Sequence, residues 1–209
     1  MLFKTSYSIG DRVLFVNRHS EFYGEQATVI GLKIIDGVPF CVSTITGLEK
    51  IEVPANSNYL ENISVYFRPV VDAPADTKLP VRGTMYSAGY DFFAPERIVI
   101  PAHGCTGLIF FNVKARFPGF MYLKLFIRSS LAVKHSITLE TSGVIDSDYY
   151  ENPDNDGNIG VKFRNNSDVD FVIEKGERCF QGIFHRYFIT IDDETEKVRV
   201  GGYGSTGKK

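Results

Sequence analysis

Short apolar runs bounded by glycine, proline or polar turns dominate the sequence after about residue 64. Such runs occupy residues 98–100, 108–111 and 123–127, and others follow at 169–173 and 187–190. Between them, Ile159, Val161 and Phe163 alternate with Gly160, Lys162 and Arg164, as expected for a half-buried strand. The one helix candidate is short, at residues 130–134. Many short strands at close spacing predict an all-β sandwich, jelly roll or barrel.

The first 60 residues predict a separate small all-β unit. Its strand candidates are residues 11–16, 27–35 (interrupted at Gly31), 38–42 and 49–53, with Asp36-Gly37 as a two-residue hairpin turn. In architecture alone, this resembles small barrels of the Tudor or KOW kind. We expect a domain at 1–62 that serves assembly or binds an unknown protein partner, followed by a domain at 63–209. Packing of the first unit onto the second as extra strands is the alternative.

Charge and composition exclude several classes of function. The net charge is −2 and the basic residues are scattered, so no direct binding of nucleic acid is expected. Cys41, Cys105 and Cys179 lie far apart and lack metal or redox spacing, which predicts reduced thiols. No apolar run is long enough to span a membrane. We therefore expect a cytoplasmic protein, or one inside the host cell if the source is viral.

The stretch from Gly143 to Tyr149 contains the main candidates for catalytic residues. It follows a strand-like run, and alternation along an extended chain would point Asp146 and Asp148 the same way. An aspartate beside a polyanionic substrate can act as a general base on water, and the ring of Tyr149 can limit substrate shape. The alternative is a hairpin that is merely acidic at its turn.

Two further stretches suit phosphate groups. Arg128, Ser129 and Ser130 precede the short helix candidate, and a helix N-terminus with an arginine favours anions. A serine N-cap is the other interpretation, and it is compatible with the first. The C-terminal residues 199–209 are glycine-rich, which predicts a flexible tail that could wrap phosphates when substrate is bound.

Five motifs occur in order: SAGYDF at 87–92, RSSLA at 128–132, GVIDSDY at 143–149, RCFQ at 178–181 and GGYGSTG at 201–207. This series resembles the signature of the trimeric dUTPases (deoxyuridine triphosphate nucleotidohydrolases). The resemblance covers residues 64 to 209. It implies a jelly-roll-like β-clip subunit, a homotrimer with shared active sites, and hydrolysis of dUTP to dUMP and pyrophosphate. That reaction keeps uracil out of DNA and supplies dUMP for dTTP synthesis.

The resemblance also implies residue roles. Asp146 activates the water that attacks the α-phosphorus, Tyr149 lies under the deoxyribose, and Tyr203 stands where the family stacks an aromatic ring on uracil. Mg²⁺ bridges the phosphate oxygens, with Asp91 near its bound waters, and a buried, hydrogen-bonded structural aspartate is the alternative for Asp91. The implied substrate-binding residues are Arg128, Ser129, Ser130, Gly143, Val144, Ile145, Tyr149, Gly160, Gln181, Arg199, Tyr203, Gly204, Ser205 and Thr206.

The chain departs from the family pattern in two places. Residues 150–158 make the hairpin about five residues longer than is usual in the family. Asp154-Asn155-Asp156-Gly157 loosely resembles a calcium loop but lacks the closing glutamate, so a polar hairpin tip is the preferred interpretation. Arg199 also lies one residue closer to the glycine pair than in many relatives.

Two alternative functions stay open at this point. The first is a dCTP deaminase, which needs a glutamate three residues before an asparagine. Here Lys162 stands in that place before Asn165, which counts against deamination. The second is a regulatory protein that uses the same body as a nucleotide-gated switch.

Overall fold

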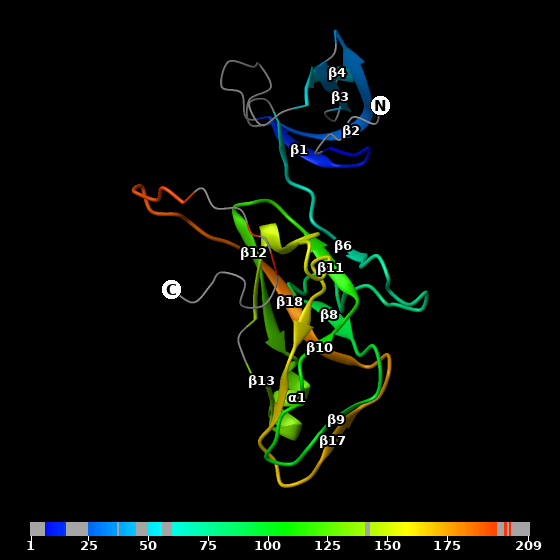
Figure 1. Ribbon diagram of the computed structural model, residues 1–209, viewed down its shortest axis with the longest axis vertical. Coiled ribbons are helices and arrows are strands. Elements are labelled where there is room, and N and C mark those ends of the chain that lie inside the picture. Colours follow the sequence, from blue (N-terminus) through cyan, green and yellow to red (C-terminus); the bar gives the residue numbers. More distant parts are fainter. Residues whose placement is uncertain are drawn as a thin grey trace. The chain divides into compact units, whose positions relative to one another are not determined.

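The computed structural model describes residues 7–15, 25–36, 38–44, 50–55, 60–140, 143–195, 199 and 201. The chain divides into two compact units, Met1–Val65 and Tyr66–Lys209. This boundary falls three residues after the one that the sequence suggested. Figure 1 shows the strands of both units.

The N-terminal unit is one antiparallel sheet with the strand order β4-β3-β2-β1-β5. Its apolar core lies on one side, around Val13, Phe15 and Val29. The interruption expected at Gly31 is instead a bulge in a continuous strand, because the pairing register shifts between Val29 and Gly31. The two-residue turn is confirmed by the pairing of Ile35 with Val38, although Gly37 itself lies outside the described residues. The strands are β1 (Arg12–Phe15), β2 (Gln26–Ile35), β3 (Val38–Thr44), β4 (Lys50–Pro54) and β5 (Leu60–Asn62).

The C-terminal unit is built around a second five-stranded sheet, in the order β14-β12-β18-β8-β7. Four two-stranded ladders pack against it, so the prediction of an all-β fold is confirmed. The strands of the sheet are β7 (Val81–Arg82), β8 (Tyr90–Phe93), β12 (Met121–Ile127), β14 (Val144–Asp146) and β18 (Arg178–Arg186). The ladders pair β6 (Tyr66–Pro69) with β11 (Val113–Arg116), β9 (Ile98–Ile100) with β17 (Phe171–Ile173), β10 (Ile109–Phe110) with β15 (Gly160–Val161), and β13 (Ile137–Leu139) with β16 (Phe163–Asn165).

Aromatic rings fill the core of this unit. Phe92 of β8 and Phe180 of β18 stack with their centroids 4.4 Å apart, and Phe111 meets Phe180 edge-on at 4.7 Å. Offset and edge-on pairs of this kind add about 0.5–1.5 kcal/mol each beyond the apolar area that they bury. The core therefore ties β8 to β18, the strands that carry the first and fourth motifs.

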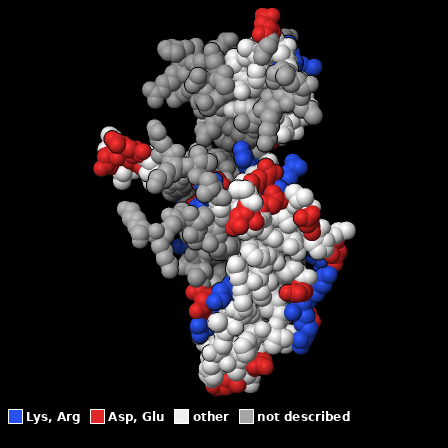
Figure 2. All heavy atoms as spheres, in the orientation of Figure 1, with Lys and Arg blue, Asp and Glu red and all other residues white. Residues whose placement is uncertain are grey.

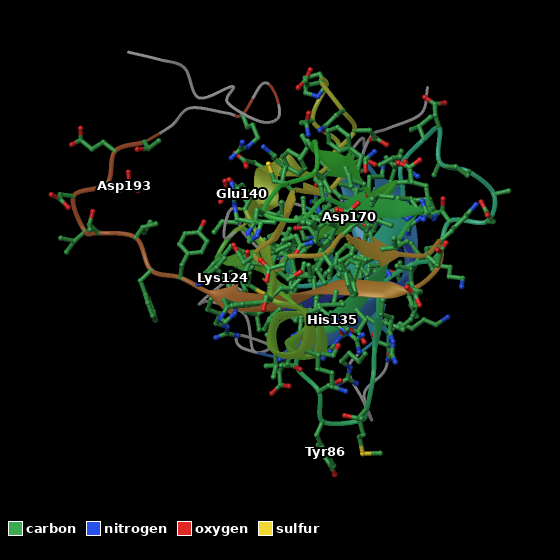
Figure 3. The ribbon with its side chains drawn as sticks, turned by 90° about the horizontal axis from the view of Figure 1, so that it is seen from below. Tyr86, Lys124, His135, Glu140, Asp170 and Asp193 are labelled. Carbon is green, nitrogen blue, oxygen red and sulfur yellow. The ribbon has the colours of Figure 1, made fainter. Side chains whose placement is uncertain are left out.

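Helical structure among the described residues is limited to α1 (Ser129–His135) and the 3-10 turn η1 (Ser147–Tyr149). The short helix candidate is therefore confirmed and extends slightly further than predicted. The expected strand at 187–190 is wrong. The ladder between β18 and β12 ends at the pair Arg186 and Met121, and the apolar side chains of Phe188, Ile189 and Ile191 beyond it are exposed. Figure 3 shows this segment extending outward to Asp193.

Candidate active site

The two faces of β12 differ in character, and this difference locates the site. Leu123 and Leu125 are fully buried in the core. Tyr122, Lys124 and Phe126 alternate with them and point to the opposite side, which we call the outward face. Lys124 is labelled in Figure 3.

Residues of three motifs share this outward face. Asp146 of β14 is paired across the ladder with Tyr122. Gln181 of β18 is paired with Phe126 on one side and with Asp91 of β8 on the other. Residues that lie directly opposite each other in a ladder point to the same face of the sheet. Asp146, Gln181 and Asp91 therefore lie on the same face of the sheet.

Asp91 lies at the centre of a compact group of charges, the Asp91 cluster, formed with Arg128 and Arg178. Its Oδ1 accepts a hydrogen bond from Arg128 Nε at 3.0 Å, and its Oδ2 accepts one from Arg178 Nη1 at 3.2 Å. Arg128 also donates to the backbone carbonyl of Arg178. Asp91 is only 8% exposed, and a buried carboxylate of this kind is stable only when it is paired.

Gly89 makes room for Gln181. A Cβ atom at position 89 would lie 2.0 Å from Gln181 Oε1, so any larger residue would push the glutamine aside. The glycine of the first motif thus serves the glutamine of the fourth motif. Both residues belong to motifs that the sequence shows, but nothing in the sequence indicates that they are in contact.

Arg128 is the N-cap of α1, and its side chain makes no capping bond. Ser129 and Ser130 are the first residues of the helix, so the interpretation of either serine as the N-cap is wrong. The N–H groups at the start of a helix have no intrahelical partner and attract anions. Arg128 directly precedes this helix start, and its guanidinium is bound to Asp91.

A second group, the Asp146 cluster, consists of Asp146, Asp148 and Arg199. Arg199 Nη2 donates to Asp146 Oδ2 at 2.5 Å, and Arg199 Nε donates to Asp148 Oδ1 at 2.8 Å. The two carboxylates therefore converge on one guanidinium, but strand alternation is not the reason. Asp146 ends β14, whereas Asp148 lies in the turn η1.

The stretch around the expected hairpin separates into two ladders. In the part of the chain that the structure describes, β14 pairs with β12 and β15 pairs with β10, so the two arms do not pair with each other. β14 is consequently an edge strand, with one side of its backbone outside any ladder. The side chain of Ile145 is buried in the core, while Val144 is exposed. Gly160 packs beside Phe110 and Ile109 of β10.

Tyr149 is held firmly by its hydroxyl. The side chain is 5% exposed within the core cluster. Its hydroxyl donates to the carbonyl of Asn158 at 2.8 Å and accepts a hydrogen bond from Asn155 Nδ2 at 2.7 Å. The preferred interpretation of residues 150–158 as a polar tip is incomplete, because Asn152 and Gly157 are buried and bonded within the loop.

A hollow of about 360 Å³ lies on the outward face beside Asp146. Its lining includes two residues of β12, Tyr122 and Lys124, which sequence reasoning missed. The signal that could have found them is the alternation along β12, which points both residues away from the core. Val144 and Tyr187 complete the lining.

The two clusters are well separated within one chain. Asp146 is opposite Tyr122 and Gln181 is opposite Phe126, four residues further along β12. At about 3.3 Å per strand residue, the separation along the strand is about 13 Å. One chain therefore does not place Gln181 against the carboxylate of Asp146.

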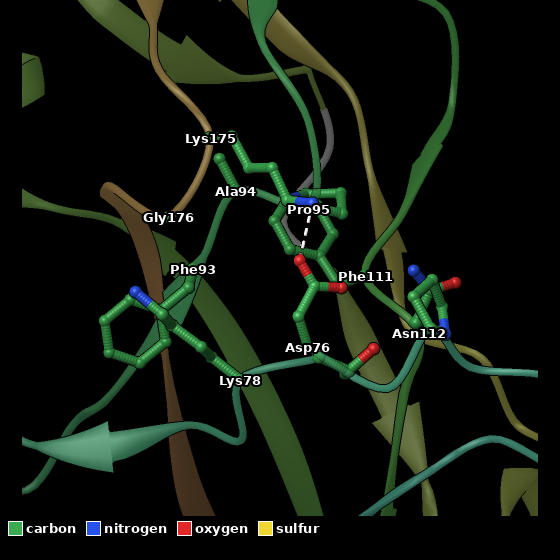
Figure 4. A pocket seen from close by; sticks show the side chains of 11 residues that line it. Asp76, Lys78, Phe93, Ala94, Pro95, Phe111, Asn112, Lys175 and Gly176 are labelled. Atoms are coloured by element: carbon green, nitrogen blue, oxygen red, sulfur yellow. Dashed lines mark hydrogen bonds and ion pairs between the residues drawn. The ribbon is translucent and has the colours of Figure 1, made fainter.

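A second hollow, of about 260 Å³, is lined by residues of other segments (Figure 4). Lys175 Nζ binds Asp76 at 2.7 Å, which lowers the pKa of that carboxyl, and Lys78 lies over the ring of Phe93 at 5.5 Å. The charged groups are thus engaged with one another or with the ring. This hollow contains no residue of the five motifs.

Within the described ranges, no three His, Cys, Asp or Glu side chains are grouped to hold a metal ion, and no helix is long and apolar enough to cross a membrane. Acidic and basic side chains are interspersed over the face that Figure 2 shows. The predicted tail residues Tyr203, Gly204, Ser205 and Thr206 lie outside the described residues.

An arginine beside a helix start suits phosphates, and an exposed carboxylate on the same face suits activation of water. Together with the β-sheet body, they are features that suit an all-β hydrolase of phosphoric anhydrides.

Comparisons with known proteins give the family. The dUTPase family model matches residues 75–207. A deoxyuridine 5'-triphosphate nucleotidohydrolase of Lactococcus lactis is 43% identical over 136 residues, which is 64% of this chain and 90% of the relative. A dUTPase structure from Streptococcus mutans has a TM-score of 0.55 and 39% identity, covering 59% of this chain and 97% of that one. A mutant dUTPase from phage phi11 of S. aureus, with a coordinated structural Mg(II) ion, has a TM-score of 0.52 and covers 64% and 97% of the two chains. At 20% identity, the phage structure shows a likeness of fold only.

The chain belongs to the dUTPase family, and it is an enzyme that hydrolyses dUTP. The match begins at residue 75, so it covers most of the C-terminal unit and leaves the N-terminal unit outside.

Proposed function

We propose that Asp146 is the general base that activates water for attack on the α-phosphorus of dUTP. The observation that carries this proposal is the position of its carboxylate, whose side chain is 52% exposed at the end of β14 beside the hollow. Asp146 takes a proton from the water as the new oxygen–phosphorus bond forms. The bond from the α-phosphorus to the bridging oxygen breaks, and dUMP and pyrophosphate are released.

The nucleoside lies against β14 and Tyr149. The backbone of Gly143, Val144 and Ile145 contacts the uracil along the edge of β14 that faces away from β12, and Gly160 of β15 approaches from the other arm. The carbonyl of Gly143 takes no part, because it accepts the N–H of Leu125. The ring of Tyr149 lies under the deoxyribose and leaves no room for a 2′-hydroxyl. The fixed hydroxyl of Tyr149 supports this role, because discrimination by shape requires a ring that does not move.

The triphosphate lies at the start of α1. Arg128, Ser129 and Ser130 contact its oxygens, and Gln181 contacts the phosphates or the attacking water. Arg199 leaves Asp146 and binds phosphate when the nucleotide arrives, and the tail closes over the site. The tail residues in this proposal are Tyr203, Gly204, Ser205 and Thr206.

Mg²⁺ fits this site as a substrate-borne ion. Both carboxylate oxygens of Asp91 accept bonds from guanidinium groups, which suits contact with metal-bound water better than direct ligation. A Mg²⁺ ion commonly keeps several waters and is held through substrate phosphates. When bound, it neutralises the charge that develops on the phosphate oxygens.

We propose a homotrimer in which each site combines residues from different subunits. The separation of about 13 Å between Asp146 and Gln181 along β12 supports this arrangement, because one site needs both groups near the same phosphorus. A second subunit that brings its Gln181 to the first subunit's Asp146 removes the difficulty. Cyclic symmetry then generates three equal sites.

Deamination of dCTP is not proposed. Asn165 is completely buried, and its Nδ2 donates to the carbonyls of Ile100 and Val169. This asparagine therefore stabilises the fold, and Lys162 replaces the glutamate that a deaminase needs.

The test of the proposal is pyrophosphate release with Mg²⁺ from dUTP, dCTP, dTTP and UTP. We expect turnover of dUTP alone, and a decrease in kcat of about 10²- to 10⁴-fold for Asp146→Asn, the range typical of a lost general base. Turnover by Asp146→Asn at the rate of the unaltered chain would exclude Asp146 as the base. Binding of dUTP without turnover by the unaltered chain would favour the nucleotide-gated switch.

Coexpression of two inactive variants tests the shared site. Asp146→Asn and Gln181→Ala chains should restore activity when they assemble together, since about a quarter of the sites in a random mixture receive both intact residues. A site made by a single chain would stay inactive in every mixture. Each variant expressed alone is the control.

The N-terminal unit is proposed to serve assembly or partner binding without contributing to hydrolysis. It has its own core, separate from the core of the second unit, and the family model does not include it. The same assay on a chain that lacks residues 1–62 should give unchanged kcat for dUTP. A large loss of kcat with the trimer intact would contradict this proposal.

A further inference from the structure

The structure assigns Asn155, in the long segment 150–158, as a positioning residue that fixes Tyr149 for selection of the sugar. This inference rests on the proposed place of Tyr149 under the deoxyribose. It concerns what holds the ring in that place, and the holding group comes from the part of the chain that is longer than in most of the family.

Asn155 contacts both the tyrosine and the loop. Its Nδ2 donates to the Tyr149 hydroxyl at 2.7 Å, while its Oδ1 accepts from the Gly157 N–H at 3.1 Å and from Asn152 Nδ2 at 2.8 Å. The amide therefore cannot rotate without losing three bonds. The carbonyl of Asn158 also holds the ring, since it accepts a hydrogen bond from the Tyr149 hydroxyl.

Asn152 makes the loop rigid. The residue is buried, and its Nδ2 also donates to the carbonyl of Tyr149 at 2.8 Å. Its Oδ1 accepts from the N–H groups of Asp154 and Asn155 at 3.1 Å each. Gly157 has φ +77°, and a Cβ atom there would lie 2.8 Å from the carbonyl oxygen of Tyr149. The loop is thus folded directly against the backbone of the residue that it holds.

A buried lysine anchors the loop to the sheet body. The side chain of Lys114, on β11, is 7% exposed, and its Nζ lies 2.8 Å from Asp156 Oδ1 and 3.2 Å from Glu151 Oε1. Asp156 also accepts the N–H of Val71. A buried ammonium with two carboxylate partners holds its neighbours in place, because breaking the pair would leave a charge uncompensated. The ion pairs with Lys114 of β11 therefore fix the loop, and with it the position of Asn155.

The consequence concerns specificity. A ring that is held at its hydroxyl keeps its distance from the sugar, so a 2′-hydroxyl meets a fixed obstacle. Without Asn155 the hydroxyl keeps only its bond to the Asn158 carbonyl, and a ring held at one point can shift slightly and admit UTP. Because one hydrogen bond is worth about 0.5–1.5 kcal/mol, loss of the Asn155 contact should change selectivity by about threefold to tenfold.

The experiment measures kcat/KM for dUTP and for UTP with Mg²⁺ in Asn155→Ala, Tyr149→Phe and the double variant. We expect Asn155→Ala to lower the dUTP-to-UTP ratio threefold to tenfold, mainly through better use of UTP. In the Tyr149→Phe background, the same substitution should change the ratio less than twofold, because the hydroxyl through which it acts is gone. Asn166→Ala is the matched control, since it removes an amide that binds the Ser136 carbonyl in another loop.

The possible outcomes separate the claims. A ratio that stays within twofold of the unaltered chain in Asn155→Ala, or one that falls equally in both backgrounds, would overturn the inference and leave Asn155 as a loop residue only. A different result would show that the proposed position of Tyr149 under the deoxyribose is wrong. Tyr149→Ala would then leave the ratio unchanged, which means that the ring does not face the sugar.

Discussion

Two aspartates on the outward face are held by arginines in opposite ways. Asp91 is 8% exposed, and both of its oxygens are bound by Arg128 and Arg178, which lie at the ends of β12 and β18. Asp146 keeps a half-exposed carboxylate, and its partner Arg199 lies 53 residues further along, outside any strand. The same ion-pair chemistry thus supports the frame in one cluster and leaves a reactive group accessible in the other.

The energetics of the two clusters should differ accordingly. Removing one partner from a buried pair costs several kcal/mol, because the remaining charge stays without compensation. The Asp146 carboxylate is half-exposed to water, and Asp148 remains bound to the largely buried Arg199 when Asp146 is replaced, so loss of the Asp146 contact should cost only about 0–1 kcal/mol. Stability should therefore depend on the Asp91 cluster, and chemistry on the Asp146 cluster.

The largest effect expected from this contrast is on thermal stability. Asp91→Asn should lower the free energy of unfolding by about 2 kcal/mol, somewhat less than for a fully buried pair, because both arginines are partly exposed. For a chain of this size, that corresponds to a decrease in Tm of about 4–8 °C. Asp146→Asn should leave Tm within about 2 °C of the unaltered chain. Calorimetry on both variants tests the contrast, and equal decreases would erase the distinction between frame and reactive group.

Local sequence signals predicted much of this arrangement. The apolar run at residues 123–127 located β12, the alternation at 159–164 located β15 and β16, and the two-residue turn at Asp36 located the first hairpin. The all-β class and the short helix after Arg128 followed from the same kind of pattern. The reason is that alternation and turn residues act over a few positions, so one stretch of chain is enough to reveal them.

Contacts between distant residues were not predictable in this way. Nothing local to Arg199 indicates that it would bind Asp146, and nothing local to Asn155 indicates that it would bind the Tyr149 hydroxyl. The error at residues 187–190 has the same origin, since an apolar run forms a strand only where a partner strand is available. β12 begins at Met121, so beyond Arg186 the pairing ends with one backbone bond, from the Tyr187 N–H to the Phe120 carbonyl.

The reactivity of the Cys179 thiol measures how often the strands joined by the Asp91 cluster open. Cys179 follows Arg178 and is completely buried, and its Sγ contacts the carbonyl of Phe92 at 3.4 Å. Burial raises the pKa of this thiol from its usual value of 9.0 to about 12. The thiol contributes stability below pH 9, and this contribution is lost as the pH rises towards 12, because the unfolded chain releases the proton first. Cys105, by contrast, is exposed.

Alkylation by iodoacetamide at pH 8, followed by mass spectrometry, should therefore label Cys105 in the native protein and leave Cys179 unmodified, since the thiolate is the reacting form. Cys41 is the internal control, because burial raises its pKa to about 11 in a unit that the substitution does not touch. In Asp91→Asn, labelling of Cys179 should rise severalfold while that of Cys41 stays constant, because β8 and β18 separate more often once the two arginines lose their common partner. If labelling of Cys179 is unchanged while Tm falls, the Asp91 cluster stabilises the ends of these strands without controlling how often they open.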